Sequence, residues 1–121
     1  MSMKIVLDSS FLIQVVERKK DLKEFILEEQ VELITTKSIL DELESISKES
    51  TKRGVKAAVA VILLKQLQIK VFETETEHDD SVLELAEKEK AGIATADDLL
   101  ASRAKKLNIK VCRLKENGKI N

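Results

Sequence analysis

The stretch Gly92-Ile93-Ala94-Thr95-Ala96-Asp97-Asp98-Leu99-Leu100-Ala101 joins a short apolar run to two acidic residues and the start of a helical pattern. Apolar residues follow Asp97 at the third, fourth and seventh positions, so we expect its side chain on the inward side of a helix and that of Asp98 on the outward side. A carboxylate on a buried stripe costs free energy unless another group neutralises it. The stretch therefore predicts a strand that ends beside an inward-facing acid.

The same arrangement occurs at two other places in the chain. Asp8 follows the apolar run 3–7, and Asp79 opens the helical pattern 79–89; each precedes apolar residues at the same three spacings. Taken singly, an Asp at such a junction is more often a helix N-cap than a ligand. Capping alone does not require three inward acids, so the recurrence favours a shared function.

Apolar runs and helical patterns alternate along the whole chain. Predicted strands cover 3–7, 31–35, 69–72, 92–94 and 109–114, and predicted helices cover 11–17, 21–29, 36–48, 55–68, 79–89 and 97–107. This alternation predicts an α/β fold in which helices cover both faces of a parallel sheet. Ligands bind beyond the carboxyl ends of the strands in such folds, where Asp8 and Asp97 are expected.

Length and composition indicate one domain with an aliphatic core. The chain has 121 residues, of which 43 % are hydrophobic and 2 % aromatic. We assign 1–115 to a single domain and 116–121 to a C-terminal tail. The centre of the fourth helix, 57–64, is apolar on nearly all sides and is predicted to be buried, either in the core or in a dimer seam.

Charge and targeting patterns restrict the function further. A formal net charge of −1 argues against a protein that coats nucleic acid through overall basicity, and the few aromatic rings argue against base-stacking platforms. Cys112 has no partner for an intrachain disulfide. No signal peptide or bilayer-spanning run is evident, so we expect a soluble cytoplasmic protein without a membrane partner.

A fourth acid, Glu42, lies at the flank of the apolar stripe of helix 36–48. If Glu42 meets the three Asp residues in one cleft, two charges about 4 Å apart repel by roughly 4 kcal/mol at an effective dielectric near 20, so the cluster needs a cation. Hard divalent cations prefer oxygen ligands, and such ions can polarise a phosphodiester and activate water. His78, the single histidine, is expected in a loop, and no Ser or Cys nucleophile can be assembled around it.

Four segments, 5–10, 39–43, 79–86 and 93–100, resemble the four motifs of PIN domains in order and spacing, over essentially the whole chain. The resemblance is to small archaeal PIN proteins similar to pre-rRNA-processing nucleases, and to toxin-type PIN nucleases. It implies a PIN-like three-layer fold with a five-stranded parallel sheet. It also implies a Mg²⁺- or Mn²⁺-dependent endoribonuclease that cuts single-stranded RNA and leaves 5′-phosphate ends. The motifs carry the catalytic and metal-binding roles onto Asp8, Glu42, Asp79 and Asp97.

The resemblance also assigns supporting roles and partners. Ser9, Asp80 and Thr95 are expected to assist the metal ligands. Ala96 stands where the family often has Asn, which implies weaker hydrogen-bond support for those ligands. Homodimers are frequent in the family, and an antitoxin or a ribosome-assembly complex is the alternative partner.

Two further interpretations concern RNA contacts and competing functions. Arg53 and Lys56 are hypothesised to guide the RNA strand, although a solvated helix face explains them equally well. A phosphorylated receiver domain has the same alternation, but it needs an acid pair after the first strand and an acceptor Asp after the third, where this chain has Glu73. A PIN fold that serves only as an interaction scaffold is the remaining alternative.

Overall fold

Five strands form one parallel sheet in this structure, a computed structural model that describes residues 2–121. The central strand is β1 (Met3–Leu7), and the order across the sheet is β3-β2-β1-β4-β5. The other strands are β2 (Val31–Thr36), β3 (Lys70–Phe72), β4 (Gly92–Ala94) and β5 (Val111–Cys112). In the register, Ile5 pairs with Leu33 of β2 on one side and with Gly92 of β4 on the other. The predicted parallel sheet is confirmed.

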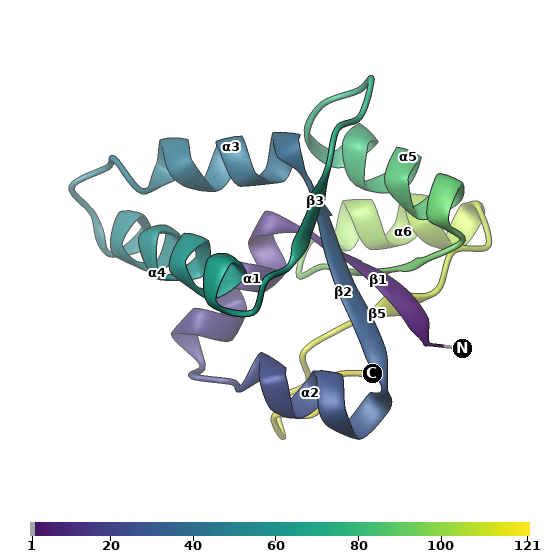
Figure 1. Cartoon of the computed structure of the whole chain (residues 1–121), viewed down its shortest axis with the longest axis horizontal. Coiled ribbons are helices and arrows are strands. Elements are labelled where there is room, and N and C mark those ends of the chain that lie inside the picture. Colours follow the sequence, from purple (N-terminus) through teal and green to yellow (C-terminus); the bar gives the residue numbers. More distant parts are fainter. Residues whose placement is uncertain (1) are drawn as a thin grey trace.

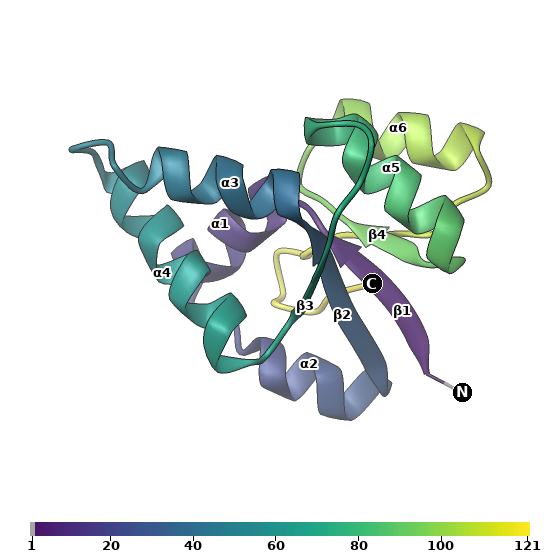
Figure 2. The same cartoon turned by 45° about the horizontal axis from the view of Figure 1, so that its top comes forward.

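Helices cover both faces of this sheet, as predicted. They are α1 (Ser9–Glu17), α2 (Leu22–Glu29), α3 (Lys37–Ile46), α4 (Lys52–Gln66), α5 (His78–Glu89) and α6 (Asp98–Lys106). Figures 1 and 2 show α1, α3 and α4 on one side and α5 and α6 on the other. From β1 the strand order runs to β2 and β3 on one side and to β4 and β5 on the other. Because crossovers between parallel strands are right-handed, the helices that connect strands in these two directions lie on opposite faces of the sheet.

The core lies where the central strands meet the helices. Ile5, Val6 and Leu7 are at most 1 % exposed, as expected for a parallel strand that is buried on both faces. Phe11 of α1 and Val82 of α5 are fully buried on the two sides of the sheet. These contacts fix the direction in which the chain leaves β1, and hence the position of Asp8.

Helix α4 is buried on one face only, so the prediction that its centre, 57–64, is buried on nearly all sides is wrong. Its inner face presents Ala57 and Ala60, which are fully buried, whereas Val55, Val59 and Ile62 are 65 %, 43 % and 54 % exposed. Small inner residues let α4 pack closely against α1 and α3, and the larger apolar residues are left on the outer face. Sequence periodicity could not distinguish these faces because both are apolar.

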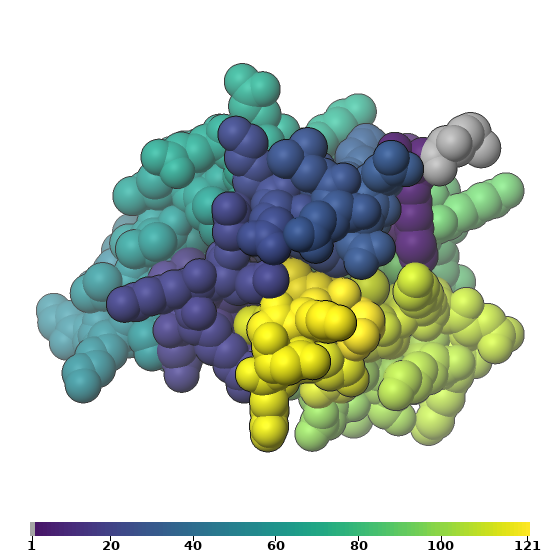
Figure 3. All heavy atoms as spheres, turned by 90° about the horizontal axis from the view of Figure 1, so that it is seen from below, coloured from purple at the N-terminus to yellow at the C-terminus, as the bar shows by residue number. Residues whose placement is uncertain are grey.

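The C-terminal residues fold back onto the domain, unlike the predicted tail 116–121. Leu114 and Ile120 form an antiparallel bridge, and Arg113 and Asn121 exchange two backbone hydrogen bonds of 2.9 and 3.0 Å. Ile120 is only 7 % exposed. Figure 3 shows these yellow residues packed beside the blue residues of α2. At the other end of the predicted domain 1–115, Met1 lies outside the described residues.

Side-chain hydrogen bonds set the entry to several helices. Thr36 caps α3 through Ile39 N, and Asp97 caps α6 through Leu99 N and Leu100 N. Glu84 of α5 accepts hydrogen bonds from the backbone of Glu75 and from Thr76 in the loop before α5, and these donors lower the pKa of Glu84 to about 2. None of the helices within residues 2–121 is long and apolar enough to cross a membrane.

Candidate active site

The four predicted acids come from four separate segments that meet at the carboxyl edge of the sheet. Asp8 directly follows β1, and its backbone N donates to Ala94 O at the end of β4, 3.0 Å away. Asp97 lies three residues beyond β4, while Glu42 lies on α3 and Asp79 in the first turn of α5. After β1 the chain continues to β2 on one side of the sheet and later to β4 on the other side, so the strand order reverses direction at β1. In such folds, ligands bind at the carboxyl ends of the strands beside this reversal.

Asp8 is a buried carboxylate and makes no cap bond to α1. Its side chain is 3 % exposed, and Oδ2 accepts hydrogen bonds from Ser10 Oγ at 2.6 Å and Thr95 Oγ1 at 2.8 Å. Burial raises the pKa of Asp8, the hydroxyl donors oppose this rise, and the charge of Glu42 adds to it. Asp8 therefore lies in an environment that disfavours its charge, and the hydroxyls of Ser10 and Thr95 offset part of this effect.

Two hydroxyl groups tie Asp8 to the loop that carries Asp97. Thr95 Oγ1 accepts from Asp97 N at 3.0 Å, and Ser10 Oγ accepts from Ala96 N at 3.1 Å. Thr95 is fully buried. The contact of Ser10 with Ala96 depends on the pairing of β1 with β4, which no local sequence pattern reveals.

Glu42 is oriented by Ser9 and faces the first residue of α5. Ser9 Oγ donates to Glu42 Oε2 at 3.0 Å, and His78 Nδ1 lies 3.8 Å from Glu42 Oε1. Asp41, the neighbouring acid, points elsewhere and pairs with Lys37. The structure thus brings Glu42, rather than Asp41, to the side of the other acids.

Asp79 lies within electrostatic range of all three other acids. Burial raises its pKa, and the charges of Asp8, Asp97 and Glu42 raise it further, while Arg103 lowers it. Asp80 points away from this group and pairs with Arg103 at 2.6 Å. The four carboxylates repel one another, so a bound cation between them would stabilise their ionised forms.

Asp97 combines a cap with a position in this cluster. Its Oδ1 accepts from Leu99 N at 2.8 Å and from Leu100 N at 3.1 Å. Its neighbour Asp98 is paired with Arg113 at 2.6 Å. Since one carboxylate oxygen is sufficient for both cap bonds, capping and ligand binding are compatible in Asp97.

The donor set suits a hydrated divalent cation. No three acidic, His or Cys side chains in the described part of the chain are close enough to form a ready-made ligand set for one ion. Mg²⁺ normally binds through one or two carboxylates and retains several waters, so a complete protein cage is not required. All four acids offer only oxygen donors, and the negative charges of Asp8, Asp97 and Glu42 repel that of Asp79. Both features fit such an ion, which one or two of the acids would bind directly.

We expect Asp79→Asn to raise the thermal stability of the metal-free protein at about pH 7. The raised pKa of Asp79 means that the folded state binds its proton more tightly than the unfolded state does. Stability from this group is therefore highest below the unfolded pKa and falls as pH rises through the folded one. Asp79 is only half-buried, so solvent screens the repulsion; the gain should not exceed about 1 kcal/mol, which corresponds to a rise in Tm of up to roughly 4 °C in a domain of this size.

Thermal unfolding in EDTA at about pH 7 and pH 3 measures this effect, which should vanish at the lower pH. Asp80→Asn is the matched control, since Asp80 shares the first turn of α5 but pairs with Arg103. Excess Mn²⁺ should reverse the order of stabilities, because bound ligand adds about 2.7 kcal/mol at 100 times Kd. A lower Tm for Asp79→Asn than for wild type in EDTA at about pH 7 would contradict the prediction.

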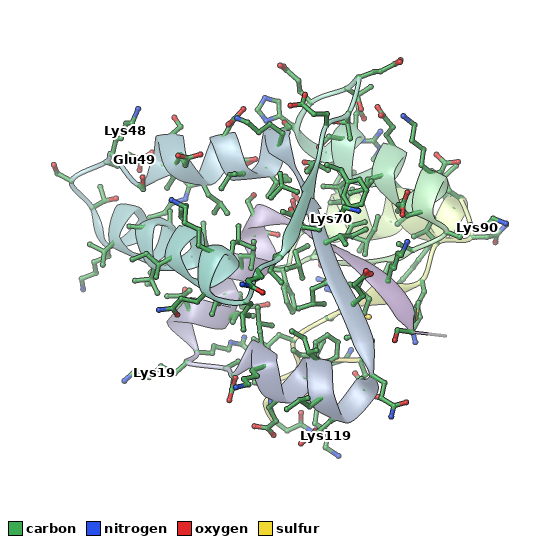
Figure 4. All side chains as sticks on the ribbon, in the orientation of Figure 1. Lys19, Lys48, Glu49, Lys70, Lys90 and Lys119 are labelled. Carbon is green, nitrogen blue, oxygen red and sulfur yellow. The ribbon has the colours of Figure 1, made fainter. Side chains whose placement is uncertain are left out.

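The predicted RNA-guiding residues lie apart from the acids. Arg53 and Lys56 belong to α4, which contributes none of the four carboxylates. Each has an acidic neighbour: Arg53 lies 3.7 Å from Glu49, and Lys56 lies 3.2 Å from Glu17. Figure 4 shows Lys48 and Glu49 at the outer end of the α3–α4 turn, beside the start of α4.

Comparisons with known proteins give consistent results. The family model described as PIN domain matches residues 5–113, a range that contains all four acids. Ribonuclease VapC9 of Archaeoglobus fulgidus is 35 % identical over 120 residues, which cover 95 % of this chain and 85 % of that protein.

Two solved structures share the fold. The PIN domain endonuclease Utp24 has a TM-score of 0.79 at 22 % identity, with 97 % of this chain and 88 % of that chain covered. VapBC2 from Rickettsia felis, bound to a DNA fragment from its promoter, has a TM-score of 0.65 at 14 % identity, with 93 % and 100 % covered. At these identities the two structures bear on the fold alone.

Proposed function

The chain belongs to the PIN-domain family, and on that premise we propose that it is a metal-dependent endoribonuclease that cuts single-stranded RNA. The observation that carries the proposal is the convergence of Asp8, Asp97 and Glu42, from three other segments, on Asp79, whose pKa their charges raise. The 35 % identity to a ribonuclease supports RNA as the substrate. We propose Mg²⁺ or Mn²⁺ as the metal, because all four candidate ligands offer carboxylate oxygens.

Each side chain has a defined part in this proposal. A bound divalent ion supplies polarisation of the phosphodiester and activation of a water. Asp8 is fixed by Ser10 and Thr95, and Glu42 is fixed by Ser9, so that neither has to reorganise when substrate binds. Water addition at phosphorus, with departure of the 3′ oxygen as a hydroxyl, leaves a 5′-phosphate on the downstream product.

Cleavage of end-labelled single-stranded RNA with Mn²⁺, Mg²⁺ or EDTA tests the proposal. We expect cutting with either metal, none with EDTA, and 5′-phosphate ends that become substrates for ligation. Double-stranded RNA of the same sequence is the control and should resist. Absence of cutting on several RNAs by folded, metal-bound protein would overturn the proposal, as would equal cutting in EDTA.

A contribution of Arg53 and Lys56 to RNA binding stays a prediction. We expect the double Ala variant to bind single-stranded RNA more weakly, because two cations near the polyanion are lost. The slope of log K against log salt should become shallower by up to about 1.4, at roughly 0.7 per phosphate contact. The acidic neighbours Glu49 and Glu17 compete with RNA for these cations and reduce the effect.

Affinity and salt slope measured by fluorescence anisotropy decide this point. The control is the double variant Lys23→Ala, Lys119→Ala, which removes the same charge elsewhere: Lys23 lies on α2, and Figure 4 shows Lys119 near that helix. Equal affinities and equal slopes for the two double variants would contradict the prediction.

A second candidate function is the toxin component of a toxin–antitoxin pair, which the likeness to VapC9 favours. Under this proposal a protein partner restrains the same nuclease. The exposed stripe of Val55, Val59 and Ile62 on α4 offers an apolar surface for such a partner or for a homodimer. A role in a ribosome-assembly complex is the remaining alternative, and co-purification from the native host separates it from the toxin proposal.

A further inference from the structure

A cavity of about 290 Å³ adjoins the acids between α3 and the start of α5. Glu42 lines this cavity and is also one of the four candidate metal ligands. Because Glu42 belongs to both, we expect an RNA whose scissile phosphate lies beside Glu42 to place a neighbouring nucleotide near the cavity. Small-molecule pockets typically start at about 300 Å³, so the volume suits one planar base rather than a longer ligand.

The ring of His78 stands at this cavity and is open to solvent. Its side chain is 72 % exposed, and Nδ1 lies 3.8 Å from Glu42 Oε1. Phe11 and Phe25 are buried, and Lys70 lies over the ring of Phe72, so His78 is the most accessible aromatic ring within residues 2–121. RNA-binding proteins commonly stack an unpaired base on such a ring.

The backbone holds His78 in place before any ligand arrives. Its φ is +54°, a left-handed conformation that non-glycine residues adopt infrequently. Its N–H donates to Ser38 Oγ of α3 at 2.7 Å. Ser81 Oγ donates to the His78 carbonyl at 2.7 Å. These bonds on both sides fix the backbone of His78 at the cavity, so the point from which its imidazole projects is set before any ligand arrives.

The rest of the lining indicates which bases fit. Ile46, only 6 % exposed, gives an apolar wall. The acidic residues Glu77 and Asp41, the latter paired with Lys37, form a carboxylate rim. Ionised carboxylates only accept hydrogen bonds. Cytosine, adenine and guanine present an exocyclic amino group with two N–H donors to such acceptors, whereas uracil presents a single N3–H donor between two carbonyl groups that a carboxylate repels.

We propose that this cavity is a nucleobase subsite for a nucleotide adjacent to the scissile phosphate, with preference for amino-bearing bases over uracil. The inference rests on the proposed ribonuclease function. The base stacks on His78 and donates its amino group to the carboxylate rim. A single ring gives one subsite, in contrast to the multi-base platforms that the composition argues against.

Cleavage of RNAs that differ only in the bases beside the cut tests the subsite. We expect roughly tenfold higher kcat/KM for amino-bearing bases than for uracil, the scale of one good base contact. His78→Asn tolerates the left-handed backbone and removes the stacking surface. It should lose roughly tenfold in kcat/KM, mainly through KM, and His78→Phe should recover most of that loss.

A binding measurement without metal separates this inference from the nuclease proposal. Uncharged cytidine and uridine are titrated in EDTA, and amide shifts at Ser38, Ser45 and His78 are followed by NMR. We expect shifts with cytidine that exceed those with uridine and that shrink in His78→Asn. If wild type cuts no RNA but these shifts appear, the nuclease proposal fails and the subsite is supported. If RNA is cut without base preference and nucleosides cause no shifts, the subsite is wrong and the nuclease stands.

Discussion

Asp97→Asn is expected to abolish metal-dependent RNA cleavage while leaving α6 in place. The side chain of Asp97 has two separate tasks: its Oδ1 caps α6, and its charge belongs to the carboxylate cluster. Asn caps helices about as well as Asp does, so the substitution removes the charge and keeps the cap. Loss of groups that only support metal ligands costs about 10- to 100-fold in activity or metal affinity, and loss of a direct ligand should cost more.

Initial rates with Mn²⁺ and calorimetric titration of Mn²⁺ measure the two consequences. The matched control is Asp21→Asn, because Asp21 caps α2 in the same way, through Lys23 N and Glu24 N, and α2 carries none of the four acids. Both variants should unfold within a few degrees of wild type, and only Asp97→Asn should lose cleavage. Full activity in Asp97→Asn would remove Asp97 from the site and leave it as a cap.

The fold was predictable because the central strands β1 and β4 are largely buried on both faces. Such strands are continuous apolar runs, and β1 and β4 have the predicted bounds, 3–7 and 92–94. Parallel strands bring their carboxyl ends to one edge of the sheet, so the sequence alone predicts that Asp8 and Asp97 lie together. The metal-binding roles of the four acids stay predictions, because the fold places these side chains but does not by itself show which ligand they bind.

Other features depend on contacts between distant segments and left no local signal. Ser10 reaches Ala96 only because β1 pairs with β4, and His78 is fixed by Ser38 from another helix. Ile120 anchors the last residues as a single apolar side chain in a polar stretch. On α4, Ala57 and Ala60 face the core while the larger Val55, Val59 and Ile62 are exposed. Larger apolar side chains are usually the more buried ones, so residue size gave the wrong expectation here.

Thr95→Val is expected to lower both stability and activity, and the two losses can be separated. Thr95 is fully buried, and its hydroxyl donates to Asp8 Oδ2 and accepts from Asp97 N. Valine has nearly the same shape, so the main change is two lost hydrogen bonds between buried groups. Buried polar groups without partners cost about 1–3 kcal/mol each, and Asp8 would lose one of the two hydroxyl donors that oppose the rise in its pKa. Cleavage should fall by about 10- to 100-fold, because the Asp8 and Asp97 segments lose their link.

Two further variants distinguish a positioning role from general destabilisation. Thr35→Val removes an equally buried hydroxyl that donates to Leu7 O at 2.8 Å and touches none of the acids. It should cost similar stability and leave the cleavage rate of the folded protein near that of wild type. Thr95→Ser keeps the hydroxyl, loses one methyl group worth about 1 kcal/mol, and should retain most of the activity. Chemical denaturation gives the stabilities, and Mn²⁺ titration gives the metal affinity. If Thr95→Val loses no more activity and no more Mn²⁺ affinity than Thr35→Val, the Thr95 hydroxyl supports only the fold.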